Sequence, residues 1–325
     1  MTKPIASLSL DLDNKWSYMK THGDEGWEKF PSYLDLVVPR FLEFLEKRSQ
    51  KITVFVVGQD AVRPENRDAI ASISAAGHEI ANHSFHHEPW LHLYKPEELL
   101  NEFQRSEDAI YDVTGQRTVG FRGPGFSLSD RVLMTLNERG YEYDCSTFPT
   151  YLGPLARMYY FFTARLTKEE KEQRKQLFGR MSDGFQPNRP FEWNLGADRL
   201  LEIPVTTMPI FKVPIHLSYI LFLSRFSTWA ARAYFWKAMK LCRIFGIGPS
   251  LLLHPLDFLG AEDDKDLAFF PAMDIESSQK IKLLGQVLDT MDKNFEIVCM
   301  RDHAHAIKRE KIRNRSIQLA RSGAS

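Results

Sequence analysis

Acidic, imidazole and guanidinium side chains follow several short apolar runs in this sequence of 325 residues. Asp11-Leu12-Asp13 ends the first run, and Asn82-His83-Ser84-Phe85-His86-His87 ends the third. Arg122, Asp144 and His254 follow three later runs. In parallel α/β folds the carboxyl ends of the strands meet at one rim, where the chemistry is done. The pattern therefore predicts a single rim site that can bind a cation and transfer protons.

The metal prediction begins with His83 and His87, which are four positions apart and can reach one ion from a helical turn or a tight loop. A carboxylate from the first strand, Asp13 or Asp11, would complete a set of two histidines and one carboxylate. Three protein ligands leave a position open for water, as in catalytic zinc sites. His86 is a rival ligand with a less favourable spacing. The alternative is a surface loop that contains histidines by chance.

Proton transfer is predicted for the remaining polar residues of the rim. Asp11 and Asp13 lie on the same side of a strand, so one can bind the metal while the other takes a proton from water. Arg122 is always charged, and next to Asp11 it would keep that carboxylate ionised. The simpler interpretation is that Arg122 forms a surface salt bridge, which would contribute little to stability. His254 is a candidate general acid because imidazole titrates near neutral pH, unless it is a satisfied buried histidine.

The predicted elements alternate between strands and helices. This repetition favours an α/β fold in which helices wrap parallel strands. Between Thr150 and Pro190 the pattern breaks into an aromatic cluster at Met158–Phe162 and a charged helical run at Lys168–Lys175. The predicted strands are 5–12, 51–57, 78–81, 120–122, 141–144, 200–205, 251–254 and 296–300, and the predicted helices are 33–48, 65–76, 96–114, 129–139 and 277–291.

Composition narrows the class of protein. The chain has 42 Lys+Arg, 42 Asp+Glu and 43% hydrophobic residues, which excludes a disordered tail and a nucleic-acid binder that works through bulk positive charge. The three cysteines are far apart and offer neither a disulfide framework nor a CxxC zinc pattern. The first residues carry no secretory signal pattern, and the longest apolar run, about Val213–Ser224, is too short to span a bilayer. We expect a cytoplasmic protein, attached at most to one membrane face.

A basic segment is predicted to form one helix from Leu221 to Phe245. Between Pro204 and Leu256 there is no acidic residue. At 100° per residue, the five basic residues of the helix and its tryptophans Trp229 and Trp236 share a sector of about 140°. Such a sector is typical of a membrane-surface helix that binds anionic lipid, and the alternative is a barrel-packing helix with a solvated face. The six basic residues between Pro204 and Leu256 are Lys212, Arg225, Arg232, Lys237, Lys240 and Arg243, and all but Lys212 lie in the predicted helix.

Four motifs together resemble those of the polysaccharide deacetylase family (carbohydrate esterase family four, the nodulation-type deacetylase domain). In chain order they are Asp11-Leu12-Asp13, His83-Ser84-Phe85-His86-His87, Arg122-Gly123-Pro124-Gly125-Phe126 and Leu252-Leu253-His254. The separated aspartates resemble the DxD subfamily. The resemblance implies one α/β domain over residues 1–325, a distorted (β/α)7 barrel with a helical, aromatic-rich insertion. We place inserted helical segments at about 151–195 and 209–248, and a disordered tail at 308–325.

The resemblance also implies roles for single residues. Asp13, His83 and His87 resemble the ligands of a divalent metal. Zn²⁺ is the default ion for this set, and Co²⁺, Ni²⁺ or Fe²⁺ would fit. The catalytic group would be Asp11 as general base, Arg122 as its tether, His254 as acid and Asp144 as the acidic partner that orients His254.

The substrate-binding residues are expected at the same rim. Trp16 and Trp90, with Trp27, follow strand ends and could form a platform for a sugar. Pro124 and Phe126 would lie beside the substrate, although Gly125 stands where many relatives carry an aromatic residue. A backbone N–H near Gly123 would help to stabilise the oxyanion.

The predicted function is hydrolysis of an N-acyl group, acetyl or formyl, from an amino sugar. A lipid-linked glycan or glycolipid is favoured over a polymer, because a polymer outside the cell would require export of the enzyme. One alternative is another C–N hydrolase on the same scaffold, acting on a small amide as allantoinase-like relatives do, but these often lack the full metal set. The other is a non-catalytic glycan- or lipid-binding protein, which would need no base and acid. No nucleic-acid partner is expected.

Overall fold

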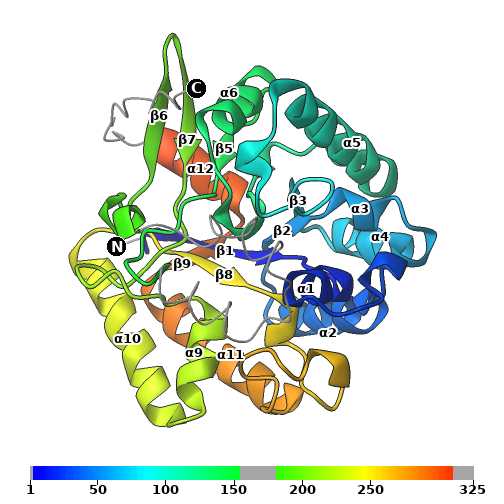
Figure 1. Ribbon diagram of the computed structural model, residues 1–325. Coiled ribbons are helices and arrows are strands. Elements are labelled where there is room, and N and C mark those ends of the chain that lie inside the picture. The colour runs from blue at the N-terminus through cyan, green and yellow to red at the C-terminus, as the bar shows by residue number, and fades with distance from the viewer. Residues whose placement is uncertain (1–2, 154–180, 310–325) are drawn as a thin grey trace.

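The computed structural model describes residues 3–153 and 181–309, which form one twisted sheet surrounded by helices (Figure 1). The strand order is β6-β7-β5-β4-β3-β2-β1-β8, and β9 pairs with the start of β1. All neighbouring strands are parallel except β6 and β7. The strands are β1 (Ile5–Asp11), β2 (Thr53–Val56), β3 (Glu79–Asn82), β4 (Gly120–Phe121), β5 (Tyr143–Asp144), β6 (Phe191–Leu195), β7 (Asp198–Glu202), β8 (Ser250–Leu253) and β9 (Glu296–Val298).

The sheet curls so that its two ends approach each other. The segment after β7 first follows β5, where the Ile203 N–H donates to the Asp144 carbonyl at 2.9 Å. It then reaches β8, where the Thr206 N–H donates to the Ser250 carbonyl at 3.0 Å and the Thr206 hydroxyl accepts from the Ser250 N–H. The ladder between β7 and β8 is open, but these bonds bridge it. The parallel strands therefore carry their carboxyl ends to a common rim.

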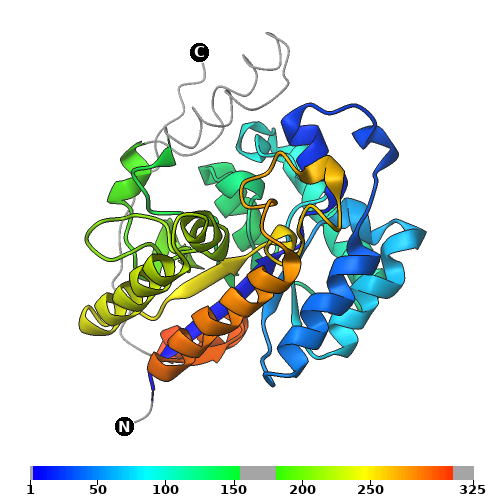
Figure 2. The ribbon, with the colours of Figure 1, turned by 90° about the horizontal axis from the view of Figure 1, so that it is seen from below.

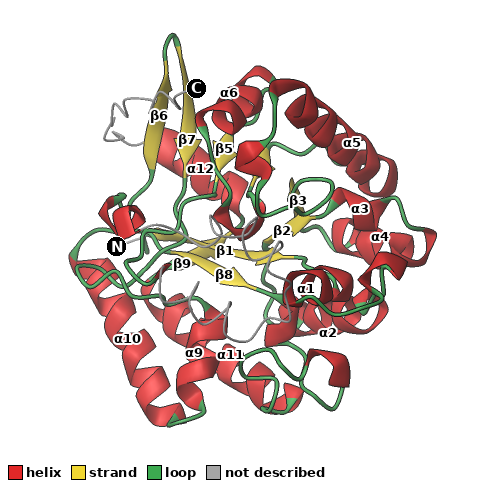
Figure 3. Cartoon of the chain, in the orientation of Figure 1, coloured by secondary structure: helices red, strands yellow, loops and turns green. Residues whose placement is uncertain are grey.

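Helices form the outer layer around the strands (Figure 3). Seen from below, α10 and α11 run next to each other outside β8 (Figure 2). None of the helices in the described ranges is both long and apolar enough to span a bilayer. The α-helices are α1 (Lys15–His22), α2 (Leu34–Glu46), α3 (Gly58–Ala61), α4 (Arg67–Ala75), α5 (Pro96–Thr114), α6 (Asp130–Glu138), α9 (Leu217–Ser224), α10 (Thr228–Ile244), α11 (Ser277–Asn294) and α12 (Met300–Arg309). Short 3₁₀ turns include η3 (Leu91–Leu93), η4 (Pro124–Phe126), η6 (Met181–Phe185) and η7 (Pro255–Asp257).

Apolar spacing and capping residues account for the helices that the sequence predicted. In α2, Leu34, Val37, Val38, Phe41 and Leu45 recur at helical spacing, and all five are fully buried. In α5, Pro96 occupies the first turn and Gly115 ends the helix in the left-handed conformation. The α/β pattern of the first half is therefore confirmed, with boundaries shifted by only a few residues.

Three sequence predictions are wrong or incomplete. The expected continuous helix from Leu221 to Phe245 is broken, because α9 ends at Ser224 and the Ser227 side chain caps a new helix by accepting from the Ala230 N–H. The segment at about 151–195 is not wholly helical, since β6 pairs with β7 in a hairpin. Helix α1 was not predicted. The aromatic cluster 158–162 and the charged run 168–175 lie outside the described residues.

A pair of glycines tests how tightly the loop after β3 packs against the start of α3. We expect Gly58→Ala to lower the free energy of unfolding by about 1–3 kcal/mol, because the new Cβ would lie 2.7 Å from Phe85 and 2.8 Å from the Ser106 Cα. Gly285→Ala in α11 meets only ordinary contacts at 3.8 Å or more and should stabilise the protein by up to about 1 kcal/mol. Urea denaturation measures both. Equal effects would contradict the packing described.

Candidate metal and catalytic site

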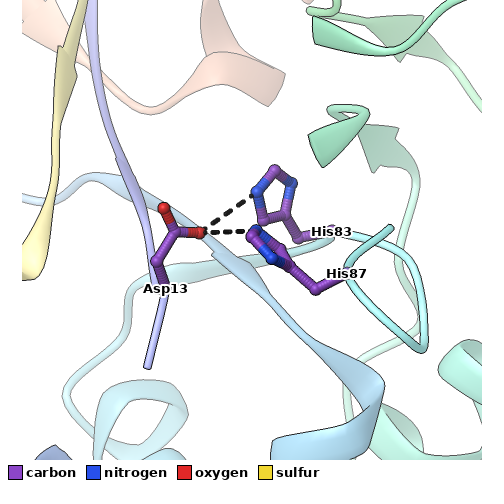
Figure 4. Close-up of side chains that lie close together, drawn as sticks. All are labelled: Asp13, His83 and His87. Carbon is purple, nitrogen blue, oxygen red and sulfur yellow. Dashed lines mark ion pairs between the residues drawn. The ribbon is translucent and has the colours of Figure 1, made fainter. Parts of the chain in front are cut away.

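Asp13, His83 and His87 converge at the rim (Figure 4). The Oδ1 atom of Asp13 lies 2.9 Å from Nε2 of His87 and 3.4 Å from Nε2 of His83. The three ligand atoms lie within 4.8 Å of one another. His83 is buried, whereas Asp13 and His87 are partly exposed. The cluster therefore has one side in the core and one side open to a substrate.

A tight loop, and not a helical turn, brings the two histidines together. Ser84 and His87 both have positive φ, at 65° and 54°, so the chain doubles back after β3. The Asn82 side chain accepts from the Ser84 N–H at 2.8 Å, and the Ser84 hydroxyl accepts from the His87 N–H at 3.1 Å. The buried Glu102 carboxylate accepts from the Phe85 N–H at 2.9 Å. These bonds fix the loop without help from an ion.

Hydrogen bonding sets the state of His83. Its Nδ1 lies 2.6 Å from the backbone carbonyl of Arg122, an acceptor only, so Nδ1 carries the proton. The lone pair of Nε2 then faces Asp13, which is the arrangement that a metal-binding histidine requires. Asp13 Oδ1 is a buried atom that lies close to Nε2 of both histidines. One carboxylate oxygen and two imidazole nitrogens this close together are a suitable donor set for a divalent cation.

The local charges agree with that arrangement. Burial opposes ionisation of Asp13, but the two imidazoles hold the pKa of its carboxyl well below the usual range. Burial also opposes protonation of His83, yet Asp11 and Asp13 raise its pKa. The cluster thus favours a positive charge at its centre. His86 does not take part, because its Nδ1 lies 2.6 Å from the Glu102 carboxylate.

Arg122 lies completely buried next to Asp11. Its Nη1 donates to Asp11 Oδ1 at 2.5 Å and to the Ser9 hydroxyl at 3.1 Å, and its Nε donates to the Cys145 carbonyl. The guanidinium carbon also lies 4.3 Å from the centre of the Phe55 ring. Burial works against the charge of Arg122, but Asp11 raises its pKa. Asp11 is therefore held in one orientation beside the metal cluster.

His254 follows β8 and is oriented through a serine. Its Nδ1 lies 3.2 Å from the Ser218 hydroxyl, which in turn donates to Asp257 Oδ1 at 2.8 Å. Because the serine proton goes to Asp257, the serine oxygen accepts from the Nδ1–H of His254. Asp257 also accepts from the His254 backbone N–H at 2.8 Å. Nε2 is left as the atom of His254 that can hold or release a proton.

Asp144 does not occupy the place that was predicted for it. It is buried and accepts from the Ser146 hydroxyl at 2.6 Å, next to Glu202, and burial raises the pKa of both carboxyls. Asp257 reaches His254 instead. The only sequence signal for Asp257 is its position three residues after His254, and Ser218 comes from an inserted helix without a motif. The predicted Asp144–His254 pair is therefore corrected.

Residues 24–143 match the family model described as polysaccharide deacetylase, and this range contains His83, His87 and Arg122. The predicted resemblance to the polysaccharide deacetylase family is confirmed. A candidate polysaccharide deacetylase from Mycobacterium smegmatis has a similar structure, with a TM-score of 0.63 and 20% identity over 98% of this chain and 94% of that one. The predicted fold of the polysaccharide deacetylase type is likewise confirmed.

Two curated relatives match a shorter part of the chain. The peptidoglycan-N-acetylmuramic acid deacetylase PdaA of Bacillus subtilis is 31% identical over 105 residues, which are 32% of this chain and 39% of that protein. The peptidoglycan-N-acetylglucosamine deacetylase PgdA of Listeria monocytogenes is 27% identical over 96 residues, 30% of this chain and 20% of that protein. The aligned region thus covers well under half of the length of each of these two relatives.

The residues predicted to bind substrate fall into two groups in this deacetylase fold. Trp16 is only 1% exposed and donates to Asp60 at 2.9 Å, with its ring edge against His87. Trp16 packs against His87 in the core, so the prediction that it forms a sugar platform is wrong. Trp90 is partly exposed, with the Lys20 ammonium 5.9 Å from its ring centre. Trp90 stays a candidate platform.

An aromatic row crosses the rim from Phe126 to His254. Phe126 stacks on Phe148 with ring centres 5.0 Å apart, Phe148 lies 5.5 Å from His216, and His216 lies 6.4 Å from His254. Burial lowers the pKa of His216 to about 3, so it packs as a neutral ring. Pro124 is buried at the start of η4, two residues before Phe126. Phe148 and His216 carry no motif and were not predicted.

Two hydrogen-bond donors of the site differ in whether they already have an acceptor. The Gly123 N–H is occupied, since it donates to the Ser146 hydroxyl at 2.8 Å. The Tyr18 hydroxyl, on the unpredicted helix α1, is buried without a partner among the described residues. Burial and the charges of Asp13, Asp257 and Asp11 raise the pKa of Tyr18 well above its usual value. Tyr18 therefore remains a donor within the field of the cluster.

The buried pair of Arg122 and Asp11 gives a test of how the site is held. We expect Arg122→Met to lower the free energy of unfolding by about 3–5 kcal/mol, because Asp11 is left as an uncompensated buried charge. Adding Asp11→Asn should recover at least about 1 kcal/mol. Denaturation of the single and double variants measures the coupling. Arg199→Met, which breaks the largely exposed pair with Glu192, should cost under about 1 kcal/mol. A similar loss in both arginine variants would refute the role of burial.

Proposed function

We propose that this chain hydrolyses an N-acyl group, acetyl or formyl, from an amino sugar with the help of a divalent metal ion. The observation that carries the proposal is the convergence of two imidazole nitrogens on one buried carboxylate oxygen of Asp13, beside the fixed carboxylate of Asp11. The family match and the two peptidoglycan deacetylases support the reaction class. Asp13, His83 and His87 would hold the ion, with zinc as the default.

Asp11 acts as general base in this proposal. When bound, the ion supplies a polarised acyl carbonyl and a water of lowered pKa. Asp11 takes the proton from the attacking water, and Arg122 keeps Asp11 in position and supplies the positive charge that opposes it. The Tyr18 hydroxyl is the donor left for a substrate oxygen, in place of the occupied Gly123 N–H.

His254 acts as general acid toward the departing amine. Its Nδ1 is held by Ser218, so Nε2 delivers the proton. Asp257 lies behind Ser218 and stabilises the imidazolium before that transfer. The aromatic row beside His254 excludes water and offers faces against which a sugar ring can pack.

The finer part of the proposal concerns the substrate and its location. We propose a lipid-linked glycan or a glycolipid, met at the cytoplasmic face of a membrane. The support is the basic face of α10, which carries exposed tryptophans. The two relatives are named for peptidoglycan, a polymer. Because the similarity covers only a short part of them, a different substrate is compatible with it.

The proposed function is tested by metal content and by release of acetate or formate. We expect the purified chain to hold about one equivalent of a transition metal and to release acyl groups from N-acetyl or N-formyl amino sugars. His83→Ala should weaken metal binding by at least about tenfold and abolish hydrolysis, because it removes one of three ligands. His86→Ala is the matched control, since its ring binds Glu102 and lies outside the cluster.

Two results would contradict the proposal. One is a wild-type protein without metal even after reconstitution, which would favour a binding protein. The other is equal loss of metal from His83→Ala and His86→Ala.

Tyr18→Phe should retain the metal and lose about tenfold or more in kcat, because the substrate oxygen loses a hydrogen-bond donor. An enzyme that cleaves small amides but no acylated amino sugar would belong to the other class of C–N hydrolases.

The orientation of His254 has a separate signature in kcat. In Ser218→Ala the Nδ1–H of His254 loses its acceptor, so the imidazole is no longer held in one orientation. We expect kcat to fall about tenfold while the metal content stays that of the wild type. Ser218→Thr keeps the hydroxyl and should restore kcat. If Asp144→Asn lowered kcat and Ser218→Ala did not, the original assignment of Asp144 would be right.

A further inference from the structure

Large apolar side chains project into solvent from α10 and from the turn that precedes it. Phe226 and Trp229 are each 78% exposed, Ile244 is 74% exposed and Trp236 is 52% exposed. Four exposed cations lie among them, and we call the whole set the α10 surface. The α10 surface consists of Phe226, Trp229, Arg232, Trp236, Lys237, Lys240, Arg243 and Ile244.

The α10 surface is one continuous face of the helix. At 100° per residue, Trp229, Trp236 and Lys240 lie near its midline and the other cations lie to either side. The opposite face is buried against the barrel through Ala231, Phe235, Ala238, Met239 and Cys242. From Trp229 to Ile244 the face is about 22 Å long. Figure 1 shows α10 at the periphery of the molecule, outside α9.

The charge of the α10 surface is uncompensated. Arg225, just before it, pairs with Asp274 at 3.0 Å. No described carboxylate lies within ion-pair distance of Arg232, Lys237, Lys240 or Arg243. The Lys240 ammonium instead lies 5.8 Å from the Trp236 ring centre. The α10 surface therefore combines exposed cations with exposed aromatic rings, and it is complementary to a partner that presents negative charges in front of an apolar layer.

We infer that the α10 surface docks on an anionic lipid membrane. Tryptophan rings partition into the headgroup region, while lysine and arginine reach back to acidic headgroups. A second copy of the chain is a poor occupant, because a two-fold interface would set these cations against one another.

The α10 surface also has a defined place relative to the catalytic rim. Arg225 at the end of α9 forms an ion pair with Asp274, in the segment between β8 and α11. Ser218 on α9, only a few residues earlier, contacts His254. Docking would therefore bring the rim next to the headgroup layer, where a lipid-linked amino sugar is found. This last step rests on the proposed function, whereas docking itself does not.

Vesicle co-sedimentation of the full chain, without substrate, tests the inference. We expect binding to vesicles of phosphatidylcholine with about 30% phosphatidylglycerol, weakened by salt, and little binding to phosphatidylcholine alone. Arg232→Glu with Lys240→Glu should reduce binding by at least about tenfold, and Trp229→Ala with Trp236→Ala should do the same. Arg117→Glu with Arg131→Glu is the matched control on exposed positions of another side, and it should bind like the wild type.

Three outcomes would overturn the inference. The first is no binding of the wild type to anionic vesicles. The second is equal loss of binding in the α10 charge variant and in the control. The third is a wild-type dimer, seen by light scattering, that becomes a monomer when Trp229 and Trp236 are replaced. Because none of these measurements involves hydrolysis, a failure here leaves the proposed deacylation untouched, and inactivity toward sugars leaves the docking result standing.

Discussion

The rest of this site depends on one buried charge, the guanidinium of Arg122. A fully buried guanidinium is tolerated only where an opposite charge and acceptors surround it, and Asp11, Ser9 and the Cys145 carbonyl provide them. These partners come from β1 and from the end of β5, while Arg122 itself follows β4. Its backbone carbonyl also binds His83 after β3. Arg122 therefore joins β4 to β1, although β3 and β2 lie between these two strands in the sheet.

This arrangement links the two halves of the proposed chemistry. The side chain of Arg122 orients Asp11, and its carbonyl fixes the tautomer of His83 so that Nε2 faces Asp13. The proposed base and the proposed metal ligands thus share one support and cannot shift independently. His254 stands apart from that support, because its orientation comes from Ser218 and Asp257 on the β8 side of the rim.

Residues attached directly to strand ends could be predicted from the sequence, and those on connecting helices could not. Strand-end motifs located Asp13, His83, His87 and Arg122. Each follows a short apolar run, and parallel strands bring their carboxyl ends to the same rim. Trp16 was wrongly predicted to be an exposed platform, because helix α1 was not predicted and the sequence gives no other sign that Trp16 is buried against His87. The break between α9 and α10 was missed because apolar and basic spacing continues across it, whereas the local cap of Ser227 decides where the second helix begins. The partner of His254 was missed because a carboxylate from a 3₁₀ turn replaces the one expected after β5.

The inserted helices connect the periphery to the chemistry through a short covalent path. Ser218 lies in the first turn of α9, and only residues 225–227 separate α9 from α10. Since α9 packs against α10, the position of Ser218 is coupled to that of α10 by direct contact between the two helices. Ser218 in turn decides which nitrogen of His254 carries the exchangeable proton. The same insertion that bears the proposed membrane face therefore also holds the proposed acid, which gives a physical reason for both to reside on one segment.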